Sequence, residues 1–248
     1  MDNALKNSYE NTQLAEQAHG EQAQTEQPQV VVLPGRPTSE WRKYVNSVIA
    51  AEISAFSRYF SQLVQWKPRA GDNGLLLQQT ACPKKKTVRD LSQLQKVLED
   101  QERSNPIDAI HSNTSHSLIL LNGNINHQYD IQAELLELKK TLTRFDRVAL
   151  VAYNPYLKWL YTLANLIGLR QGEQPTTFVT RTVLNTLANI SGYEVVKLKP
   201  VVYFPFKCFG LGDILNAALP VIPVVKWLSL ASIVMLRPII ADKKPRSV

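Results

Sequence analysis

From residue 117 onward the chain alternates strand-like apolar runs with helical patterns, and this alternation limits the folds that it can adopt. Ser117–Leu121 is strongly apolar and is followed by a helical pattern over Asp130–Leu142. Arg147–Tyr153 is a second strand-like run, and the helical pattern over Pro155–Ile167 begins with proline, which a first helical turn tolerates. Such alternation is typical of a mostly parallel sheet covered on both faces. We therefore expect an α/β fold.

The pattern changes toward the C-terminus. A helix over Thr180–Ile190 precedes a strand over Tyr193–Lys199, and a short helix over Ile214–Leu219 precedes a final strand over Ser229–Leu236. Val201–Phe206 is a candidate for one more strand. Two strand-like runs around a short helix predict an antiparallel, hairpin-like edge.

The half before residue 117 is less regular. Apolar residues over Glu40–Gln65 mostly follow three-and-four spacing, which predicts one long amphipathic helix. Leu75–Gln79 is interpreted as a buried strand, and Lys84–Lys86 as part of a basic loop. Asp90–Arg103 has a second helical pattern, whereas Ile107–Ser112 is ambiguous.

The first residues differ from the rest in composition. Residues 1–29 are polar and contain little apolar surface, so their burial could not offset the entropy lost on ordering, and we expect a disordered polar tail. Residues 30–70 are then a strap and a leading amphipathic helix. Residues 71–240 form the main α/β domain, and residues 241–248 form a basic tail.

Charge and cysteine content limit the partners and the compartment. The formal net charge is +7, but the positive charges are scattered, apart from Lys84–Lys86 and the Lys243–Arg246 tail. No series of aromatic residues alternates with them, so no nucleic acid partner is expected. Cys82 and Cys208 lie far apart in the sequence, so a disulfide framework is not expected, and a reducing, cytoplasmic location is favoured. No cluster of residues suggests a metal site. The polar N-terminus does not have the pattern of a secretory signal.

The longest apolar stretch, Ala217–Met235, is interrupted by Pro220, Pro223 and Lys226. It does not have the pattern of a membrane-spanning helix. We interpret it as part of the core, with peripheral membrane contact as the alternative.

A known family is suggested by the loop after Leu121. The run Leu120–Gln132, with the sequence LLNGNINHQYDIQ, resembles the loop after the fourth strand in one subgroup of class I S-adenosylmethionine-dependent methyltransferases. That subgroup is often fused to, or encoded beside, family 2 glycosyltransferases of polysaccharide synthesis. Further segments resemble the family in the same order: Val151–Pro155, Leu166–Leu169, Glu173–Pro175, Ser191–Val196 and Val234–Pro238.

The resemblance implies a Rossmann-like sheet, S-adenosylmethionine as cofactor, and a small-molecule, sugar or lipid acceptor. It also implies a glycosyltransferase as a partner. In the family the first strand ends in an acidic residue and a Gly-x-Gly-x-Gly loop, whose backbone approaches the cofactor closely. Leu75–Pro83, which we interpret as the equivalent stretch, has neither glycine nor carboxylate. Between Leu77 and Leu121 there is room for about one strand–helix unit, where the family has two. We therefore expect a sheet shortened at one edge and an impaired cofactor pocket.

Ligands of such folds bind outside the carboxyl ends of the strands, and the candidate site residues follow from this. His127, as a proton acceptor, and Tyr153 are the candidate catalytic residues. The other candidates are cofactor contacts at Gln79, Asn122 and Gly123, and substrate contacts at Asn124 and Asn154.

Several candidates have a purely structural alternative. His127 could bind the local backbone, and Asn122 could end its strand in a turn. Asp130 is interpreted as a helix cap, and Asn154 before a proline also suits a helix start.

Three functions follow from these observations. The first is a methyltransferase that acts on a small molecule, a sugar or a lipid, for which cofactor binding is indispensable. The second is a non-catalytic relative that serves as a binding or scaffolding module in glycan or lipid assembly. The third is a decayed gene product without a selected role.

Overall fold

The computed structural model describes residues 39–69, 72–104, 116–127, 130–166, 175–223 and 225–240. The chain divides into a unit of residues 1–31 and a unit of residues 32–248, and every described residue belongs to the second. The predicted tails at 1–29 and 241–248, the apolar part of the strap at 30–37 and the ambiguous stretch 107–112 lie outside the described residues.

The described residues contain a six-stranded sheet with the order β2-β1-β3-β4-β6-β5. The strands are β1 (Gln62–Trp66), β2 (Lys85–Val88), β3 (Ser117–Asn122), β4 (Arg147–Tyr153), β5 (Tyr193–Val201) and β6 (Ala231–Pro238). The first four pair in parallel. β6 is antiparallel to both of its neighbours, β4 and β5. The α/β, Rossmann-like class and the antiparallel C-terminal strand are therefore confirmed.

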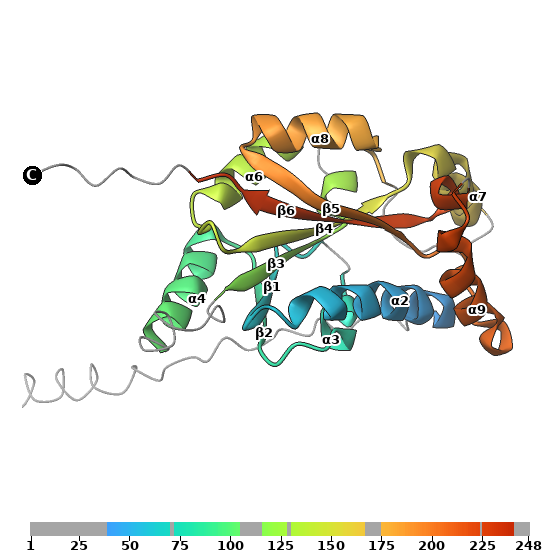
Figure 1. Cartoon of the computed structure of the whole chain (residues 1–248), viewed down its shortest axis with the longest axis horizontal. Helices are drawn as coiled ribbons and strands as arrows, with labels where there is room; N and C mark the ends of the chain where they lie inside the picture. The colour runs from blue at the N-terminus through green and yellow to red at the C-terminus, as the bar shows by residue number, and fades with distance from the viewer. Residues whose placement is uncertain are drawn as a thin grey trace, which may run out of the picture. The chain divides into compact units, whose positions relative to one another are not determined.

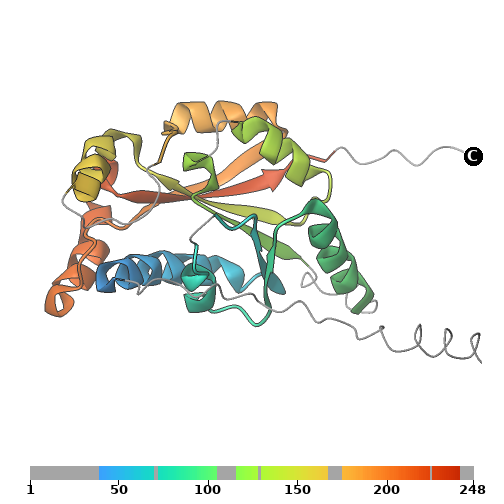
Figure 2. The same ribbon diagram turned by 180° about the vertical axis from the view of Figure 1, so that it is seen from behind.

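Helices cover both faces of the sheet. Figures 1 and 2 show α6 and α8 on one face and α2 and α3 on the other. The α-helices are α2 (Glu40–Ser57), α3 (Leu75–Gln79), α4 (Leu91–Ser104), α6 (Ile131–Lys139), α7 (Lys158–Leu166), α8 (Arg181–Ile190) and α9 (Leu211–Ala218). Short 3-10 turns are η1 (Asn124–Asn126), η2 (Pro155–Leu157), η3 (Cys208–Gly210), η4 (Leu219–Val221) and η5 (Val225–Leu228). No helix among the described residues is both long and apolar enough to cross a membrane.

The alternation of side chains along β3 builds two separate cores. Ile119 and Leu121 belong to the core shared with α4, α6 and α8, whereas Leu118 and Leu120 belong to the core shared with α2 and α3. All four side chains are buried. Because successive residues of a strand point to opposite faces, a strand covered on both faces is apolar throughout, which is the pattern that made β3 recognisable.

The predicted helix over Glu40–Gln65 is wrong in its second half. The helix α2 ends at Ser57, and Gln62–Trp66 is instead the parallel strand β1 between β2 and β3. No glycine or proline separates the two elements, so the sequence contains no signal for the boundary. Pairing with two neighbouring strands and complete burial of β1 override the helical spacing.

Three further assignments are also corrected. Leu75–Gln79 is a single helical turn rather than a strand, with Leu76 and Leu77 buried. A short apolar run does not distinguish these two states. The lysines at 85 and 86 lie in the edge strand β2 rather than in a loop. Val201–Phe206 is not a separate strand, because β5 extends to Val201 and ends where Val202 adopts a φ of 58°.

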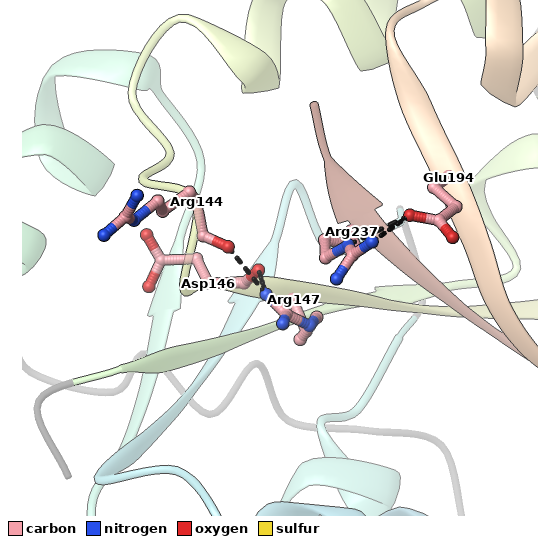
Figure 3. A network of polar contacts seen from close by, with 5 residues as sticks. All are labelled: Arg144, Asp146, Arg147, Glu194 and Arg237. Atoms are coloured by element: carbon pink, nitrogen blue, oxygen red, sulfur yellow. Dashed lines mark hydrogen bonds and ion pairs between the residues drawn. The ribbon is translucent and has the colours of Figure 1, made fainter. Parts of the chain in front are cut away.

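At the amino-terminal edge of the sheet, the buried carboxylate of Asp146 joins two segments. It accepts hydrogen bonds from the Ser117 amide at the start of β3 and from the Thr143 amide and hydroxyl, each at 2.8 Å. Figure 3 shows the surrounding network, in which Arg147 donates to the carbonyl oxygens of Arg144 (2.9 Å) and Asp146 (2.8 Å). Asp146 thereby fixes the start of β3 against the turn before β4.

The same network includes an ion pair across the antiparallel strands. Arg237 of β6 donates to Glu194 of β5, its cross-strand partner (Nε–Oε2 3.0 Å; Figure 3). Both side chains are about half exposed, so solvent weakens this pair. Burial, followed by the nearby Arg237 charge, lowers the pKa of Arg147.

A second buried carboxylate lies in the first turn of α6. Glu134 is 5% exposed, and neither of its carboxylate oxygens has a hydrogen bond of standard geometry within the described residues. Burial raises its pKa, although the Lys67 charge and the nearby Trp66 and Asn124 donors favour the ionised form and partly oppose this.

We expect Asp146→Ala to lower the free energy of unfolding by about 2–4 kcal/mol, because it leaves two backbone amides without their charged acceptor. Urea unfolding followed by circular dichroism measures this. Glu194→Ala, which removes an exposed partner, is the matched control and should cost less than about 1 kcal/mol. Equal losses of stability in the two variants would contradict the role assigned to Asp146 in joining β3 to the turn before β4.

We expect Glu134→Gln to gain stability relative to the wild type as the pH rises from about 4 to 7. A carboxylic acid with a raised pKa in the folded state binds more protons there than in the unfolded state. Wild-type stability therefore falls as the pH rises above the ordinary value of 4.5, whereas glutamine does not titrate. Thermal unfolding of both proteins across this range tests the sign, and a constant difference would refute it.

Candidate functional site

The candidate site lies at the carboxyl ends of β1, β3 and β4. The connection from β1 leads through α3 to β2 on one side, whereas the connection from β3 leads through α6 to β4 on the other. In open α/β sheets, ligands bind where the strand order reverses in this way, outside the carboxyl ends of the strands. This point lies between β1 and β3, and we refer to it as the switch point.

Arg69 reaches across the switch point from the loop after β1. Its Nε donates to the carbonyl oxygen of Asn122 (3.0 Å), and its Nη2 donates to the hydroxyl of Tyr153 (3.5 Å). Its Nη1 lies 2.6 Å from His127 Nε2. Gly123, at a φ of 70°, fits closely below, because a Cβ there would lie 3.3 Å from the Tyr153 hydroxyl and 3.5 Å from Arg69 Cζ.

The Asp72 carboxylate closes the same point from the other end of the loop. Its Oδ2 accepts hydrogen bonds from Gln65 Nε2 of β1 (2.7 Å) and from Asn122 Nδ2 of β3 (3.0 Å). Its Oδ1 accepts from the Gly74 amide (2.9 Å). The Arg69 guanidinium and the Asp72 carboxylate thus occupy the space above the strand ends in which a ligand of this fold would bind.

His127 is held as a hydrogen-bond acceptor. A guanidinium can only donate, so the 2.6 Å contact with Arg69 requires a lone pair on Nε2 and therefore a neutral imidazole. The ring meets the Tyr153 ring edge-on, with 6.5 Å between centroids. The two predicted catalytic residues are thus brought together, but the lone pair that a general base needs is bound to Arg69.

Two asparagines of η1 fasten the strand ends. Asn124 is buried and donates to the carbonyl oxygen of Lys67 (3.0 Å). Asn126 is buried and accepts from the Tyr153 amide (2.9 Å) and donates to the Thr177 carbonyl oxygen (2.9 Å). Both side chains support the backbone around the switch point. Asn124, which was predicted to contact the substrate, thus has a structural partner instead.

Asn154, the other predicted substrate contact, also has structural partners. Its Oδ1 accepts from the Tyr156 amide (3.0 Å), and its Nδ2 donates to the carbonyl oxygens of Trp227 (2.7 Å) and Ser229 (2.6 Å). The predicted cap at Asp130 is confirmed, since its carboxylate accepts from the Ala133 amide (2.8 Å).

Gln79 does not lie at a strand end. It is part of α3 and donates to the Lys43 carbonyl oxygen of α2 (3.4 Å). The reason for predicting it as a cofactor contact is therefore removed. Because β1 is the first strand, the segment to compare with the family's glycine loop is 67–74, which contains Gly71, Asp72 and Gly74, rather than Leu75–Pro83.

A small cavity adjoins the end of β4. Its volume is about 30 Å³, and Asn154, Val179, Arg181 and Trp227 are among the residues that line it. Pockets that bind drug-sized ligands have volumes of about 300–1,000 Å³, so this cavity, as arranged, does not hold a nucleotide. The described His, Cys, Asp and Glu side chains form no group of three that could hold a metal ion.

Sequence reasoning missed Arg69, Asp72 and Asn126. The signal for the first two was their position directly after an apolar strand, and it was hidden because Gln62–Trp66 was assigned to a helix. For Asn126 the run Asn122–His127 pointed to the correct loop but did not distinguish between its three asparagines.

Comparison with known proteins gives structural matches only. No protein-family model and no curated protein sequence matches the chain. A SAM-dependent methyltransferase from Archaeoglobus fulgidus matches at 9% identity and a TM-score of 0.45, over 77% of this chain and 94% of that one. Magnesium protoporphyrin IX methyltransferase from Synechocystis PCC 6803, solved with bound SAH, matches at 10% identity and a TM-score of 0.42, over 84% and 91%. Mitomycin 7-O-methyltransferase matches at 11% identity and a TM-score of 0.43, over 78% of this chain, which spans about half (54%) of that enzyme.

Proposed function

We propose that this chain is a relative of S-adenosylmethionine-dependent methyltransferases that acts as a non-catalytic binding or scaffolding module in glycan or lipid assembly. The observation that carries the proposal is the position of Arg69 at the switch point, bound to Asn122, His127 and Tyr153. The kinship rests on the motif resemblance between Leu120 and Pro238.

The residues at the switch point, as arranged, do not fit a nucleotide cofactor. A cofactor with a positively charged sulfonium would meet the guanidinium of Arg69, which has the same sign of charge. The carboxylate of Asp72, which could have bound a ribose hydroxyl, already accepts three hydrogen bonds from Gln65, Asn122 and Gly74. The chain's own groups therefore satisfy the polar atoms that a cofactor would need.

Methyl transfer to a small molecule, sugar or lipid is the second candidate. It is favoured by one observation, namely that the switch point is closed by polar contacts from a single loop rather than by apolar packing. A ligand can replace such contacts because each has a low net free energy in the presence of water. If Arg69 moved away, the neutral imidazole of His127 would regain the lone pair needed for proton acceptance.

We expect the wild-type chain to show no saturable heat with S-adenosylmethionine or S-adenosylhomocysteine up to about 1 mM in isothermal titration calorimetry. At that limit the binding free energy is weaker than about −4 kcal/mol. A micromolar dissociation constant for either compound would contradict the non-catalytic proposal and support the methyltransferase candidate.

We expect Arg69→Ala to lower the free energy of unfolding by about 1–2 kcal/mol, since it removes the guanidinium's hydrogen bonds, and not to create cofactor binding. Arg237→Ala is the matched control, because it removes an arginine from an exposed ion pair at the opposite edge of the sheet. Urea unfolding and calorimetry measure the two effects. Tight S-adenosylmethionine binding by Arg69→Ala but not by Arg237→Ala would instead identify an enzyme that Arg69 holds closed.

A further inference from the structure

One end of the sheet carries a set of large apolar side chains that face solvent. Figures 1 and 2 both place α7 and α9 at this end, and contacts between α9, η4, η5 and η2 connect them. We call it the apolar end, and its exposed members include Trp159, Phe209, Leu211, Ile214, Val221 and Trp227. Ile214 is 65% exposed and Val221 is 78% exposed, so these are not partly buried core residues.

The helix α9 is reversed relative to an ordinary surface helix. Leu211 and Ile214 face solvent, whereas Asn216 is turned toward the protein. The Asn216 amide group accepts from the backbone amides of Tyr203 (2.6 Å) and Phe204 (3.0 Å). A surface helix normally places its apolar stripe against the core and its polar residues outside. Folding therefore does not explain the apolar outer side of α9.

The helix α7 also exposes apolar side chains to solvent. Trp159, Leu163 and Leu166 are spaced four and three residues apart and are all exposed. That spacing places them on one side of a helix. Two neighbouring elements thus direct apolar side chains outward at the same end of the sheet.

A turn in an unfavourable backbone conformation presents the outermost apolar side chain. Cys208, Phe209 and Gly210 have φ values of 36°, 53° and 94°, and Phe209 is fully exposed. Non-glycine residues adopt this region only at a cost, and such strain is characteristic of functional sites. No described contact of the Phe209 side chain repays the strain within the protein.

Three basic residues and one acidic residue flank the exposed apolar side chains of the apolar end. Lys207 precedes the Phe209 turn, Lys158 precedes Trp159, and the Arg181 guanidinium lies 5.2 Å from the ring centre of Trp227. Asp213 is the only acidic residue between Pro200 and Ile240, and its carboxylate is bound by the Tyr44 hydroxyl at 2.9 Å. Apolar and aromatic side chains with basic neighbours match the interface of an anionic membrane.

We propose that the apolar end docks on an anionic lipid surface, with the Phe209 turn and α9 lying in the interfacial layer. The hydrocarbon-facing groups are Phe209, Leu211 and Ile214, and the lysines contact the headgroups. This site is separate from the switch point, so the proposal does not depend on whether a cofactor binds there.

Co-sedimentation of the full chain with vesicles tests the proposal. We expect the wild type to partition onto phosphatidylcholine vesicles that contain phosphatidylglycerol, and less onto pure phosphatidylcholine or at high salt. Phe209→Ser/Ile214→Ser should bind at least about tenfold more weakly, since two apolar side chains no longer enter the interface. Its melting temperature should be unchanged, because both side chains are exposed. Ile190→Ser/Val196→Ser also replaces two exposed apolar side chains (55% and 54%), on α8 and β5 away from the apolar end. It is the control and should bind like the wild type.

Tryptophan quenching by brominated lipids gives a second readout that needs no variant. Trp159 and Trp227 belong to the apolar end, so we expect quenching by brominated anionic vesicles. The proposal is overturned if the wild type neither sediments with nor is quenched by anionic vesicles, or if both double variants lose binding equally. It is also overturned if Phe209→Ser/Ile214→Ser converts a dimer into a monomer in analytical ultracentrifugation without an effect on lipid binding, because the apolar end would then join two copies of the chain.

Discussion

The Asp72 carboxylate is the contact on which the closed carboxyl edge of the sheet depends. It joins the side chains of Gln65 in β1 and Asn122 in β3, and it also binds the Gly74 amide of its own loop. Arg69 of the same loop reaches over the strand ends, where its guanidinium donates to the Asn122 carbonyl oxygen. The neutral state of His127 and the loss of its free lone pair follow from that position.

Carboxylates hold β3 at both ends, but with different consequences for stability. At the amino end, Asp146 binds two backbone amides and is buried. At the carboxyl end, Asp72 is partly exposed and binds two side chains and one amide of its own loop. The apolar interior of β3 contributes to both cores and involves neither group. The fold can therefore persist when the loop after β1 moves, which makes the closure of the switch point separable from folding.

The limits of helices and strands could be predicted from the sequence where a local signal marked each boundary. Thr180 and Asp130 cap helices that begin as predicted, and β4 has the predicted limits because a turn precedes it and Asn154-Pro155 follows it. The sequence was insufficient between Ser57 and Gln62, where no breaker separates helix from strand and only the pairing of β1 with its neighbours decides. That one error shifted the comparison with the family's glycine loop to Leu75–Pro83. It also hid Arg69, whose role depends on a fold contact that leaves no local pattern.

Asn154 connects the carboxyl end of β4, beside the switch point, with the apolar end. It follows Tyr153 at the end of β4, and its side-chain amide donates to the carbonyl oxygens of Trp227 and Ser229. The backbone of η5, which carries Trp227 of the apolar end, is thus fixed directly behind the strand end that bears a candidate catalytic residue. Since these bonds are short and Asn154 is buried, the apolar end cannot shift far without displacing the end of β4. A lipid surface bound at the apolar end would therefore be linked to the end of β4 through Asn154.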